Sequence, residues 1–516
     1  MRLLLLAAPL LSGLPAPARP RLVVVVTVDQ LRPDYLDRYR RQLIGGLGLL
    51  LSEGAVFSNA FQDHAVSETA PGHASILSGR WPEHTGIMLN SLGVQDSSAP
   101  LLEVPGPPAS PARFRGTTLF DWLQAAAPGA RALSVSRKDR AAILTLGRAK
   151  QQVYWYQAGV FTTSRYYGDS LPSWVEAFNA RQIPMQLAGR TWATYLDAAE
   201  YPEPDSVPYE HGGRDFVFPH RIPSDGAHAA VSLVEFPTMD SLTLAFALEG
   251  VRALGLGGGG RTDLLAVGLS TTDAIGHLYG PESREIHDQV VRLDRYLGTF
   301  FGQLMVRYGP ANVLIVLTAD HGVTPFPEWS RTHGHPAALA VSVDTIIAAV
   351  NRALPPRADS APWLTFDTGL LLLRERATLA AAPVDVDSVL RDLADRVRRV
   401  PGVARVDSPD ALAHADTVGD PVARRWVHEI VPAAGVELAV TLVPYSVWGS
   451  GSVAEHGQPS DLDTHVPLLF WGRGVRRGTY AERVGAVDIA PTLAALLELS
   501  AAETTDGRPL GEIIAH

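Results

Sequence analysis

The amino-acid sequence predicts an α/β fold in which a mostly parallel central sheet is flanked by helices. Four apolar runs have the length of buried strands, at residues 22–28, 132–135, 264–269 and 313–317. Their near-continuous content of Val, Leu, Ile and Ala is typical of strands that are covered on both faces. Between such runs, residues 284–304 carry apolar side chains at helical spacing. Strands that alternate with helices indicate parallel connections within one sheet.

The composition of the 516-residue chain supports a large buried core and narrows the kinds of site it can hold. Hydrophobic residues make up 46% of the chain and charged residues 19%, which is unlike a disordered chain. The formal net charge of −10 argues against a nucleic-acid-binding protein, which needs a basic face. The chain has no cysteine, which excludes disulfides, cysteine nucleophiles and thiolate zinc sites. Any metal site must therefore use histidine and carboxylate ligands.

The N-terminal segment has the pattern of a secretory signal peptide. Arg2 precedes an apolar run over residues 3–14, and the Ala-Pro-Ala sequence at residues 16–18 offers a cleavage site. The run is too short to span a bilayer. We therefore expect residues 1–18 to be removed and the mature chain, residues 19–516, to be periplasmic or secreted. We expect no integral membrane segment after processing, and we favour a monomer.

Two stretches interrupt the strand and helix pattern and are expected to be insertions into one large domain. The first, about residues 100–230, begins with a proline-rich loop and carries Lys138 and Arg140. The second, about residues 341–441, has strand and helix patterns of its own, including a helix pattern at 386–400. We expect this second stretch to form a small subdomain.

Each of the four predicted strands ends at polar residues that could take part in chemistry. Ligands of open α/β sheets bind beyond the carboxyl ends of the strands. One such residue could stand there by chance, but four strand ends together predict a shared site. In strand order, the residues are Asp29, then Lys138 with Arg140, then Asp273, and last Asp320 with His321.

Some of these residues have the spacing of metal ligands. Asp273 and His277 are four residues apart, so both side chains would lie on one face of a helical turn. Asp320 and His321 are adjacent, and neighbouring side chains diverge on a strand. Both can reach one ion only if the backbone bends there, which Gly322 would permit.

Two further residues extend this ligand set. His456 precedes a predicted C-terminal strand at residues 466–471, and Asp29 ends the first strand. The total of three carboxylates and three imidazoles suits zinc and exceeds what one tetrahedral ion needs. We therefore predict two metal ions about 4 Å apart, of the kind that clamp the attacking and leaving oxygens. The remaining candidates, His84, His333 and His335, are expected to be structural.

The segment at residues 67–79 contains the candidate nucleophile, Thr69, at a predicted helix start. Taken alone, a threonine in this place would be an N-cap. The same place offers unpaired backbone N–H groups and the positive end of the helix dipole, which stabilise an alkoxide and bind phosphate oxygens. Asn90, further along the chain, could donate an amide N–H to a phosphate oxygen.

The ordered set of residues resembles the alkaline phosphatase superfamily over nearly the whole mature chain. The Ser-Arg-Lys-Asp-Arg sequence at 136–140 and the aromatic-rich stretch at 161–167 are most similar to the phosphate-irrepressible alkaline phosphatases, which are bacterial periplasmic phosphomonoesterases. The features that carry the resemblance are Asp29 at a strand end, Thr69 in a Thr-Ala-Pro-Gly-His context, Asn90, Asp273 with His277, Asp320-His321-Gly322 and His456.

The resemblance implies an alkaline-phosphatase-like catalytic domain over residues 19–516. It also implies hydrolysis of small-molecule phosphate monoesters to an alcohol and inorganic phosphate, through a phosphothreonine intermediate on Thr69. Asn90, Lys138 and Arg140 would then contact the phosphoryl oxygens.

The resemblance also implies two zinc ions per chain. A third, magnesium site is not expected, because the sequence departs from the serine and arginine pattern of the best-known members. One zinc would be held by Asp273, His277 and His456. The other would be held by Asp29, Asp320 and His321, with Thr69 bound to it.

Three alternatives remain open at this point. A phosphodiesterase or nucleotide pyrophosphatase of the same superfamily shares the metals and a threonine nucleophile. A sulfatase fits less well, because Thr-Ala-Pro-Gly-His stands in place of the sulfatase motif around a modified cysteine or serine. A catalytically inactive binding protein on this fold would have lost ligands or the nucleophile, whereas every expected ligand is present.

Overall fold

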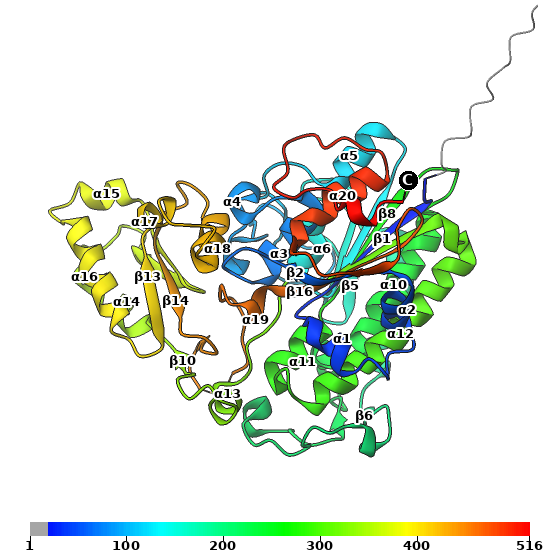
Figure 1. The fold of residues 1–516 in the computed structure, drawn as a ribbon, viewed down its shortest axis with the longest axis horizontal. Helices are drawn as coiled ribbons and strands as arrows, with labels where there is room; N and C mark the ends of the chain where they lie inside the picture. Colours follow the sequence, from blue (N-terminus) through cyan, green and yellow to red (C-terminus); the bar gives the residue numbers. More distant parts are fainter. Residues whose placement is uncertain (1–18, 452, 516) are drawn as a thin grey trace, which may run out of the picture.

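The structure is a computed structural model that describes residues 19–451 and 453–515. The predicted signal peptide at residues 1–18 lies outside the described residues. Figure 1 shows a large body built around one sheet and a smaller lobe, on the left, that contains a second sheet.

Within the described residues, the central sheet has ten strands in the order β17-β2-β16-β9-β1-β8-β3-β4-β5, with β18 also paired to β2. The middle strands from β9 to β4 are all parallel. Strand β16 is antiparallel to both β9 and β2, and β5 is antiparallel to β4. The predicted mostly parallel sheet is therefore confirmed. The strands are β1 Leu22–Val28, β2 Ala55–Phe61, β3 Ala132–Ser136, β4 Gln152–Gln157, β5 Val160–Thr162, β8 Asp263–Leu269, β9 Val313–Thr318, β16 His465–Gly472, β17 Gly478–Tyr480 and β18 Val484–Gly485.

The four predicted apolar runs form four neighbouring strands of this sheet. Strand β1 has the predicted bounds, and β3, β8 and β9 each extend one residue beyond the predicted run. Every residue of β1 is buried. Its side chains alternate between two apolar cores, with Val24 and Val26 in one and Val23 and Val25 in the other. The central strands are thus covered on both faces, as their composition predicts.

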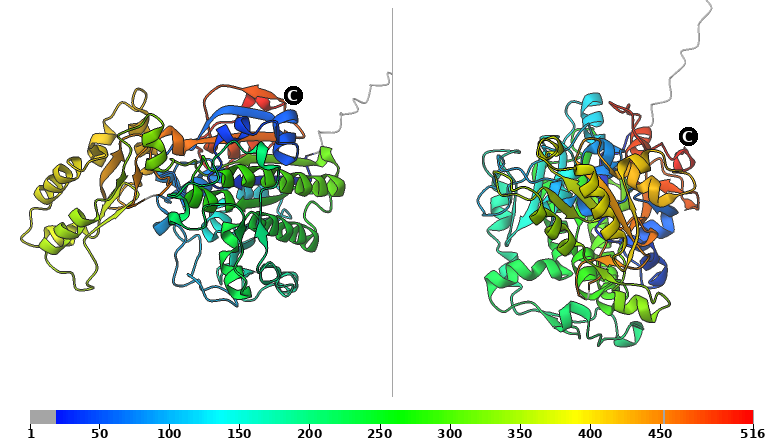
Figure 2. Two further views of the ribbon diagram at one scale, coloured as in Figure 1. Left: turned by 90° about the horizontal axis from the view of Figure 1, so that it is seen from below. Right: turned by 90° about the vertical axis from the view of Figure 1, so that its left-hand side faces the viewer.

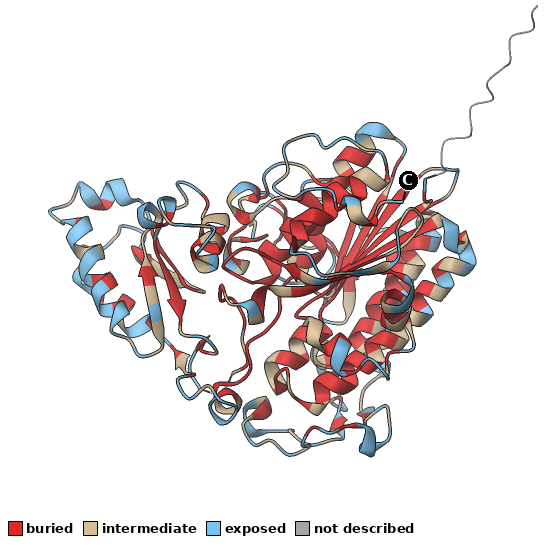
Figure 3. Cartoon of the chain, viewed as in Figure 1, coloured by how far each residue is buried: buried red, intermediate tan, exposed pale blue. Residues whose placement is uncertain are grey.

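Helices cover the two faces of the central sheet. On one face lie α2 (Gly46–Glu53), α10 (Thr238–Leu254) and α12 (Arg284–Tyr308). The predicted helix at 284–304 is α12, and four apolar positions of its predicted face are fully buried in the core against the sheet, namely Ile286, Val290, Leu293 and Leu297. Figure 3 shows this burial as red helix faces turned toward the sheet. The helices on the other face are α3 Thr69–Ser78, α5 Leu119–Ala126, α6 Asp139–Thr145 and α20 Ile489–Leu496.

The smaller lobe is built on a second, antiparallel sheet in the order β11-β12-β14-β13. Helices α14 (Asp344–Ala353) and α16 (Val386–Arg398) share an apolar core with this sheet and are exposed on their outer sides (Figure 3). The left view of Figure 2 shows the lobe at one end of the molecule, and the right view looks onto that end. Whether residues 341–441 fold as an independent unit stays a prediction. The strands are β11 Leu364–Asp367, β12 Leu370–Leu373, β13 Val403–Asp407 and β14 Val436–Leu442.

The lobe packs on the large body through a separate apolar cluster. Trp426 of α18 (Pro421–Glu429) and Leu370 of β12 share this cluster with Val66 and Met88 of the large body. The segment that contains Val66 leads directly into α3. The lobe is therefore fixed against the start of the helix that carries Thr69.

Part of the stretch expected as the first insertion belongs to the central sheet. Residues 132–162, within this stretch, contribute β3, β4 and β5 to that sheet.

Among the described residues, no single helix has both the length and the apolar character needed to cross a bilayer. One sharply bent pair, Gly226–Glu235 with Thr238–Leu254, passes on length and composition alone.

Candidate active site and metal centre

The carboxyl ends of β9, β1, β8 and β3 lie side by side, as the strand order requires. Asp29, Lys138, Asp273 and Asp320 follow these strands, and all four are buried. Lys138 Nζ lies 3.0 Å from Asp29 Oδ2 and 2.7 Å from Asp273 Oδ2. The structure thus brings residues from the four predicted strand ends together.

Helix α11 (Thr271–Tyr279) begins directly after β8 and carries Asp273 and His277. Their spacing puts both side chains on one helix face, with His277 Nε2 at 3.3 Å from Asp273 Oδ1. The predicted helical arrangement of this pair is confirmed.

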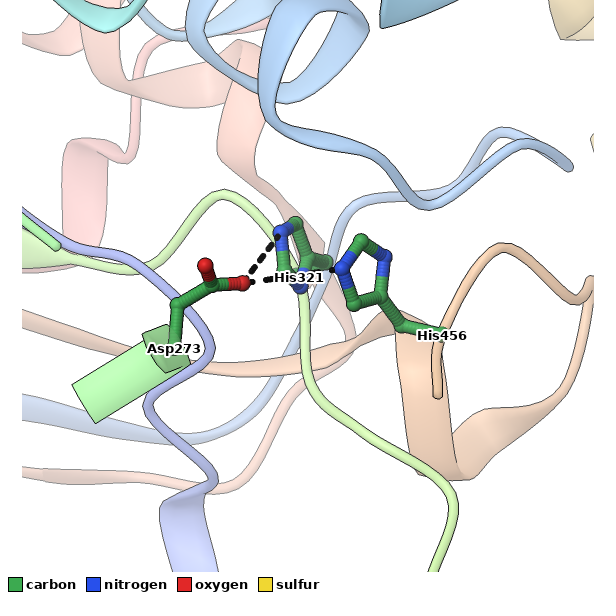
Figure 4. A group of neighbouring side chains, drawn as sticks. All are labelled: Asp273, His321 and His456. Atoms are coloured by element: carbon green, nitrogen blue, oxygen red, sulfur yellow. Dashed lines mark ion pairs between the residues drawn. The ribbon is translucent and has the colours of Figure 1, made fainter. Parts of the chain in front are cut away.

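Asp273 also faces His321 and His456, which come from distant parts of the chain (Figure 4). Asp273 Oδ1 lies 3.9 Å from His321 Nε2 and 3.5 Å from His456 Nε2. The two imidazole rings stack with a centroid separation of 3.7 Å. The three ligand atoms lie within 4.8 Å of one another, close enough to hold one ion.

Three histidines of the site, His277, His321 and His456, each direct Nδ1 to a backbone carbonyl and Nε2 toward the cluster. A carbonyl can only accept a hydrogen bond, so Nδ1 carries a proton and the neutral ring offers the lone pair of Nε2. Such contacts orient the imidazoles of metal sites. The Nδ1-to-oxygen distances are 2.9 Å from His277 to Ala454, 2.9 Å from His321 to Gly322 and 2.7 Å from His456 to Ser67.

A second potential ligand group combines Asp29, Asp320 and His73. His73 Nε2 lies 3.6 Å from Asp29 Oδ1, and His73 Nδ1 lies 3.3 Å from Asp320 Oδ2. Lys138 bridges this group to Asp273. The structure thus places His321 Nε2 between Asp320 Oδ2, at 3.5 Å, and Asp273 Oδ1, at 3.9 Å, and sets His73 beside Asp29 and Asp320. The ligand pairing that the resemblance implies stays a prediction.

Gly322 does not have the role that the sequence predicts for it. Its φ lies outside the left-handed region, so the backbone bend there does not need a glycine. Instead, a Cβ atom on Gly322 would lie 2.2 Å from the Leu462 carbonyl oxygen. The Gly322 N–H donates a hydrogen bond of 2.6 Å to the Asp463 carbonyl. The glycine is required by the close approach of two backbones, which holds His321 in the cluster.

The charges and the polar atoms of this cluster fit divalent cations. Three carboxylates, of Asp29, Asp273 and Asp320, are buried in the cluster, and the ammonium of Lys138 pairs with two of them, Asp29 and Asp273. Within the described part of the chain, Asp29 Oδ1, Asp320 Oδ2 and His321 Nε2 are buried without a hydrogen-bond partner. Leaving such atoms unpaired is costly. Oxygen and imidazole nitrogen are the ligands that zinc takes in the absence of cysteine.

The protonation of the ligands depends on their neighbours. Burial disfavours ionisation of Asp273, but Lys138 and the histidines outweigh it and hold the pKa of the carboxyl well below its usual range. Burial and the nearby His456 lower the pKa of His321. Burial also opposes the charge on His456, yet Asp273 and Glu455 raise its pKa to about 9. Because a metal must displace that proton, metal binding should weaken as the pH falls.

Thr69 is the first residue of α3, and Glu68 occupies the N-cap position. The N-cap expectation for Thr69 is therefore wrong by one residue. Thr69 is fully buried, and its Oγ1 accepts a hydrogen bond of 2.9 Å from Lys138 Nζ. The hydroxyl thus lies at the helix N-terminus and in contact with a cation, two features that stabilise its deprotonated form.

Asn90 is fixed against the same helix end. Its Oδ1 accepts a hydrogen bond of 2.9 Å from the Ala70 N–H. This contact uses the amide oxygen, so the NH₂ group is left as the donor of a side chain that lines the same cavity as Thr69. Asn90 therefore offers a hydrogen-bond donor beside Thr69.

Glu68 links Asn90 to the smaller lobe. Its Oε2 accepts a hydrogen bond of 2.6 Å from the Asn90 backbone N–H, and its Oε1 accepts one of 2.7 Å from Thr368 Oγ1. Thr368 lies in the turn between β11 and β12, with a φ of 43°. A Cβ atom on Gly457 would lie 2.2 Å from Thr368 Cγ2, so the turn also packs closely against Gly457, the residue that follows His456. We call this Glu68–Thr368 contact the lobe clamp.

The predicted catalytic residues open on one cavity of about 390 Å³. Thr368 of the lobe and Trp448, which packs against the apolar core of the lobe, also line it. Its volume suits a small ligand. The predicted residues that line it are Thr69, Asn90, Lys138, Arg140, Asp273, His277 and His456.

Three histidines expected to be structural lie in other contacts. His84 Nδ1 is 2.8 Å from Asp506 Oδ2, at an exposed position. His333 stacks on Trp329, and His335 stacks on Tyr445. Within the described residues, none of the three belongs to a potential metal-ligand group.

Several residues of the cavity and its surroundings are not predicted by the sequence pattern. His73 could have been found, because it follows Thr69 by one helical turn. Glu455 precedes His456 and forms a ligand group with it and His277. No sequence signal connects Thr368 with Glu68, since 300 residues separate them.

A sequence model of the family described as type I phosphodiesterase/nucleotide pyrophosphatase matches residues 23–395. The chain belongs to this family. The match covers most of the central sheet and the first part of the lobe. Membership places the chain in the alkaline phosphatase superfamily, as the residue pattern predicts, and this superfamily is metal-dependent.

This chain is similar to two alkaline phosphatases over nearly the whole length of each. Alkaline phosphatase PafA of Elizabethkingia meningoseptica is 30% identical over 533 residues, which cover 96% of this chain and 95% of PafA. Alkaline phosphatase PhoV of Synechococcus elongatus is 32% identical over 524 residues, which cover 96% of this chain and 93% of PhoV. The chain is thus close to the branch that the sequence analysis names.

The fold is shared with a solved alkaline phosphatase. The crystal structure of wild-type PafA matches with a TM-score of 0.88 and 28% identity, covering 97% of this chain and 100% of PafA. A PafA variant with a threonine, an asparagine, a lysine and an arginine substituted matches with the same score. The predicted alkaline-phosphatase-like fold is confirmed.

Proposed function

We propose that this chain is an alkaline phosphatase that hydrolyses phosphate monoesters through a phosphothreonine at Thr69, next to two zinc ions. One observation carries the proposal: Thr69, Asn90, Lys138 and Arg140 open on the same cavity as Asp273, His277 and His456 of the histidine and carboxylate cluster. The alkaline phosphatases PafA and PhoV, similar over nearly their whole length, support the same reaction.

The PafA variant gives this assignment further support. Its substituted threonine and asparagine have the same separation in the sequence as Thr69 and Asn90. Its substituted lysine and arginine have the same separation as Lys138 and Arg140. The four residue types thus occur in the same order with the same local spacing.

We propose that the cluster holds two zinc ions, which would supply Lewis-acid stabilisation of the attacking and leaving oxygens when bound. Three carboxylates outweigh one lysine, so two divalent cations would turn the site positive and suit a phosphate dianion. The proposed ligands are Asp273, His277 and His456 for one ion, and Asp29, Asp320, His321 and Thr69 for the other.

The chain's own residues would carry out a two-step transfer. The Thr69 oxygen attacks phosphorus, and the bond between phosphorus and the ester oxygen breaks, so that the alcohol leaves with a proton from solvent. A water molecule then attacks the phosphothreonine and releases inorganic phosphate, which restores the Thr69 hydroxyl. Lys138 and the α3 N-terminus favour the deprotonated form of Thr69. Asn90 and Arg140 orient the phosphoryl oxygens, and this positioning supplies much of the catalysis.

We expect the lobe clamp to position Asn90 through Glu68, and a substitution of Thr368 tests this. Thr368→Val removes the hydroxyl that holds Glu68 Oε1, so Glu68 can swing and release the Asn90 backbone. We expect kcat to fall by about fivefold to tenfold, as for the loss of one hydrogen bond of about 1–1.5 kcal/mol. Thr368→Ser keeps the hydroxyl and should restore kcat. Steady-state kinetics with an aryl phosphate test this, and equal losses in both variants would exclude a role for the hydrogen bond.

The nearest alternative is a phosphodiesterase, which the family's description also names. A monoester dianion presents three non-bridging oxygens, whereas a diester has one charge less and an extra substituent. Lys138 and Arg140 both line the cavity and place two positive charges in its wall, with Lys138 in contact with Thr69. A compact ammonium cannot be exchanged freely for a guanidinium at such a site. This charge arrangement favours the monoester.

We therefore expect Lys138→Ala/Arg140→Ala to reduce kcat/KM for an aryl monophosphate by on the order of 100- to 10,000-fold. Hydrolysis of the corresponding methyl diester should fall much less, because this substrate lacks the charge that the two residues contact. The measurement is kcat/KM for both substrates in wild type and double variant. Equal losses on both, or a wild type that prefers the diester, would favour the phosphodiesterase.

We also propose that the protein is exported, with residues 1–18 removed, and that it is a monomer. The Arg2-apolar-Ala-Pro-Ala pattern of the sequence motivates the first statement. N-terminal sequencing of the protein from its native cell should begin near Arg19. A protein that begins at Met1 would exclude processing. Light scattering measures the oligomeric state.

A further inference from the structure

A second cavity of about 400 Å³ shares lining residues with the catalytic cavity. Lys138 and Arg140 line both cavities, so the two share a basic wall. The second cavity is also lined by Arg137, Trp155 and Gln157. Its walls thus combine three basic side chains with one carboxylate, Asp139, and with an aromatic ring and a side-chain amide, so that positive charge predominates and a polar ligand can be recognised.

Arg137 has an incomplete set of partners within the described residues. Its Nη2 lies 3.8 Å from Asp273 Oδ2, which is too far for a hydrogen bond. Its Nε is buried without an acceptor. Only 19% of the Arg137 side chain is exposed to solvent, so water cannot fully replace the missing acceptors.

Arg140 also lacks hydrogen-bond acceptors for part of its guanidinium group. Its Nε is also buried without an acceptor among the described residues, and its closest carboxylate oxygen, Asp139 Oδ1, lies 3.6 Å away. Burial and the charge of Arg140 oppose ionisation of Arg137, and they lower its pKa even though Asp273 acts in the other direction. Two neighbouring guanidinium groups are thus held in partial burial without hydrogen-bonded anions, an arrangement that is costly by itself.

Metal binding would leave the positive charge of Arg137 with even less compensation from nearby anions. Asp273 is the carboxylate closest to Arg137, and it is a proposed zinc ligand. Once its negative charge is shared with a divalent ion, Asp273 compensates Arg137 less. The phosphoryl group would satisfy Arg140 from the catalytic cavity. Arg137 would then still lack an anion, and the second cavity is the space where one can bind.

We propose that Arg137 and the second cavity form a subsite for a second anionic group of the substrate. The group is an oxyanion, phosphate or carboxylate, that accepts two parallel hydrogen bonds from a guanidinium. The preferred substrates are therefore phosphate monoesters whose alcohol carries such a group close to the scissile phosphate. This statement rests on the proposed phosphomonoesterase function and narrows its substrate class.

Three substrates with the same carbon chain test the subsite. Propanediol bisphosphate carries a second phosphate, the phosphate monoester of hydroxypropanoate carries a carboxylate, and propanediol monophosphate carries a neutral hydroxyl. In the zinc-loaded wild type, we expect kcat/KM for at least one anionic substrate to exceed that for the neutral one by tenfold or more, as for one charge-assisted hydrogen bond. Which anion has the advantage distinguishes a phosphate subsite from a carboxylate subsite.

Arg137→Gln should remove this advantage and leave kcat/KM for the neutral substrate and the zinc content nearly unchanged. Arg137→Lys should retain part of it, because the charge remains but the fork of donors is lost. Arg165→Gln is a matched control at an exposed arginine, with 57% of its side chain accessible. It should change none of the three values.

Two outcomes would overturn the subsite. In the first, the wild type hydrolyses all three substrates equally well. In the second, Arg137→Gln lowers kcat/KM for all three by the same factor, which would indicate a general effect on the metal site. Neither outcome affects the proposed function, whereas a wild type that hydrolyses none of the three monoesters would contradict the function itself.

Discussion

Thr69→Ala is expected to reduce kcat for phosphate monoester hydrolysis by several orders of magnitude. The substitution removes the oxygen that attacks phosphorus, and a water molecule in its place lacks the fixed position at the α3 N-terminus and the contact with Lys138. Zinc content should stay nearly intact, because three carboxylates and three imidazoles remain. The measurement combines kcat for an aryl phosphate with metal analysis of the same preparation.

Two further variants separate the loss of the nucleophile from a loss of stability. Thr69→Ser keeps a hydroxyl and should retain much of the activity. Thr145→Ala removes another buried threonine, on α6, whose Oγ1 contacts only the Ala141 carbonyl among the hydrogen bonds of the described residues. It should leave kcat unchanged. If Thr69→Ala retained wild-type kcat, Thr69 could not be the nucleophile.

Removal of the metal ions is expected to abolish hydrolysis. The purified protein should contain close to two zinc ions per chain, and a chelator should remove both the ions and the activity. The physical reason is the net negative charge of the cluster, in which three buried carboxylates repel a phosphate dianion unless cations are bound. Full activity after exhaustive removal of metal would contradict the two-metal assignment.

His456→Ala tests the assignment of one ion. We expect this variant to lose about one zinc per chain, since His456 is proposed to bind one ion only. His333→Ala is a suitable control, because His333 stacks on Trp329 outside the cluster. The control should retain both ions, and loss of both ions in His456→Ala would show that the two sites are not independent.

The sheet and the polar residues at its edge could be predicted from the sequence for physical reasons. Strands buried on both faces must be almost entirely apolar, so the runs that form β1, β3, β8 and β9 stand out. A polar residue directly after such a run marks the carboxyl end of a central strand, where ligands of these sheets bind. Asp273 and His277 could be paired because helical spacing is a local property.

The contacts that complete the site depend on the tertiary fold. Thr368 reaches Glu68 only because the lobe packs on the segment before α3. The role of Gly322 depends on the carbonyl of Leu462, which comes from a later segment. The sequence predicts a bend at this glycine because glycine permits one, whereas the structure requires it for close packing. Neither the approach of two backbones nor the grouping of His73 with Asp29 follows from local spacing.

Trapping the covalent intermediate tests the central assignment most directly. Zinc-loaded enzyme is mixed with excess aryl phosphate and quenched with acid, and its peptides are analysed by mass spectrometry. We predict that one phosphoryl group is attached to Thr69, in the peptide that also contains the Thr-Ala-Pro-Gly-His sequence. A phosphoryl group attached to any other residue would contradict the account.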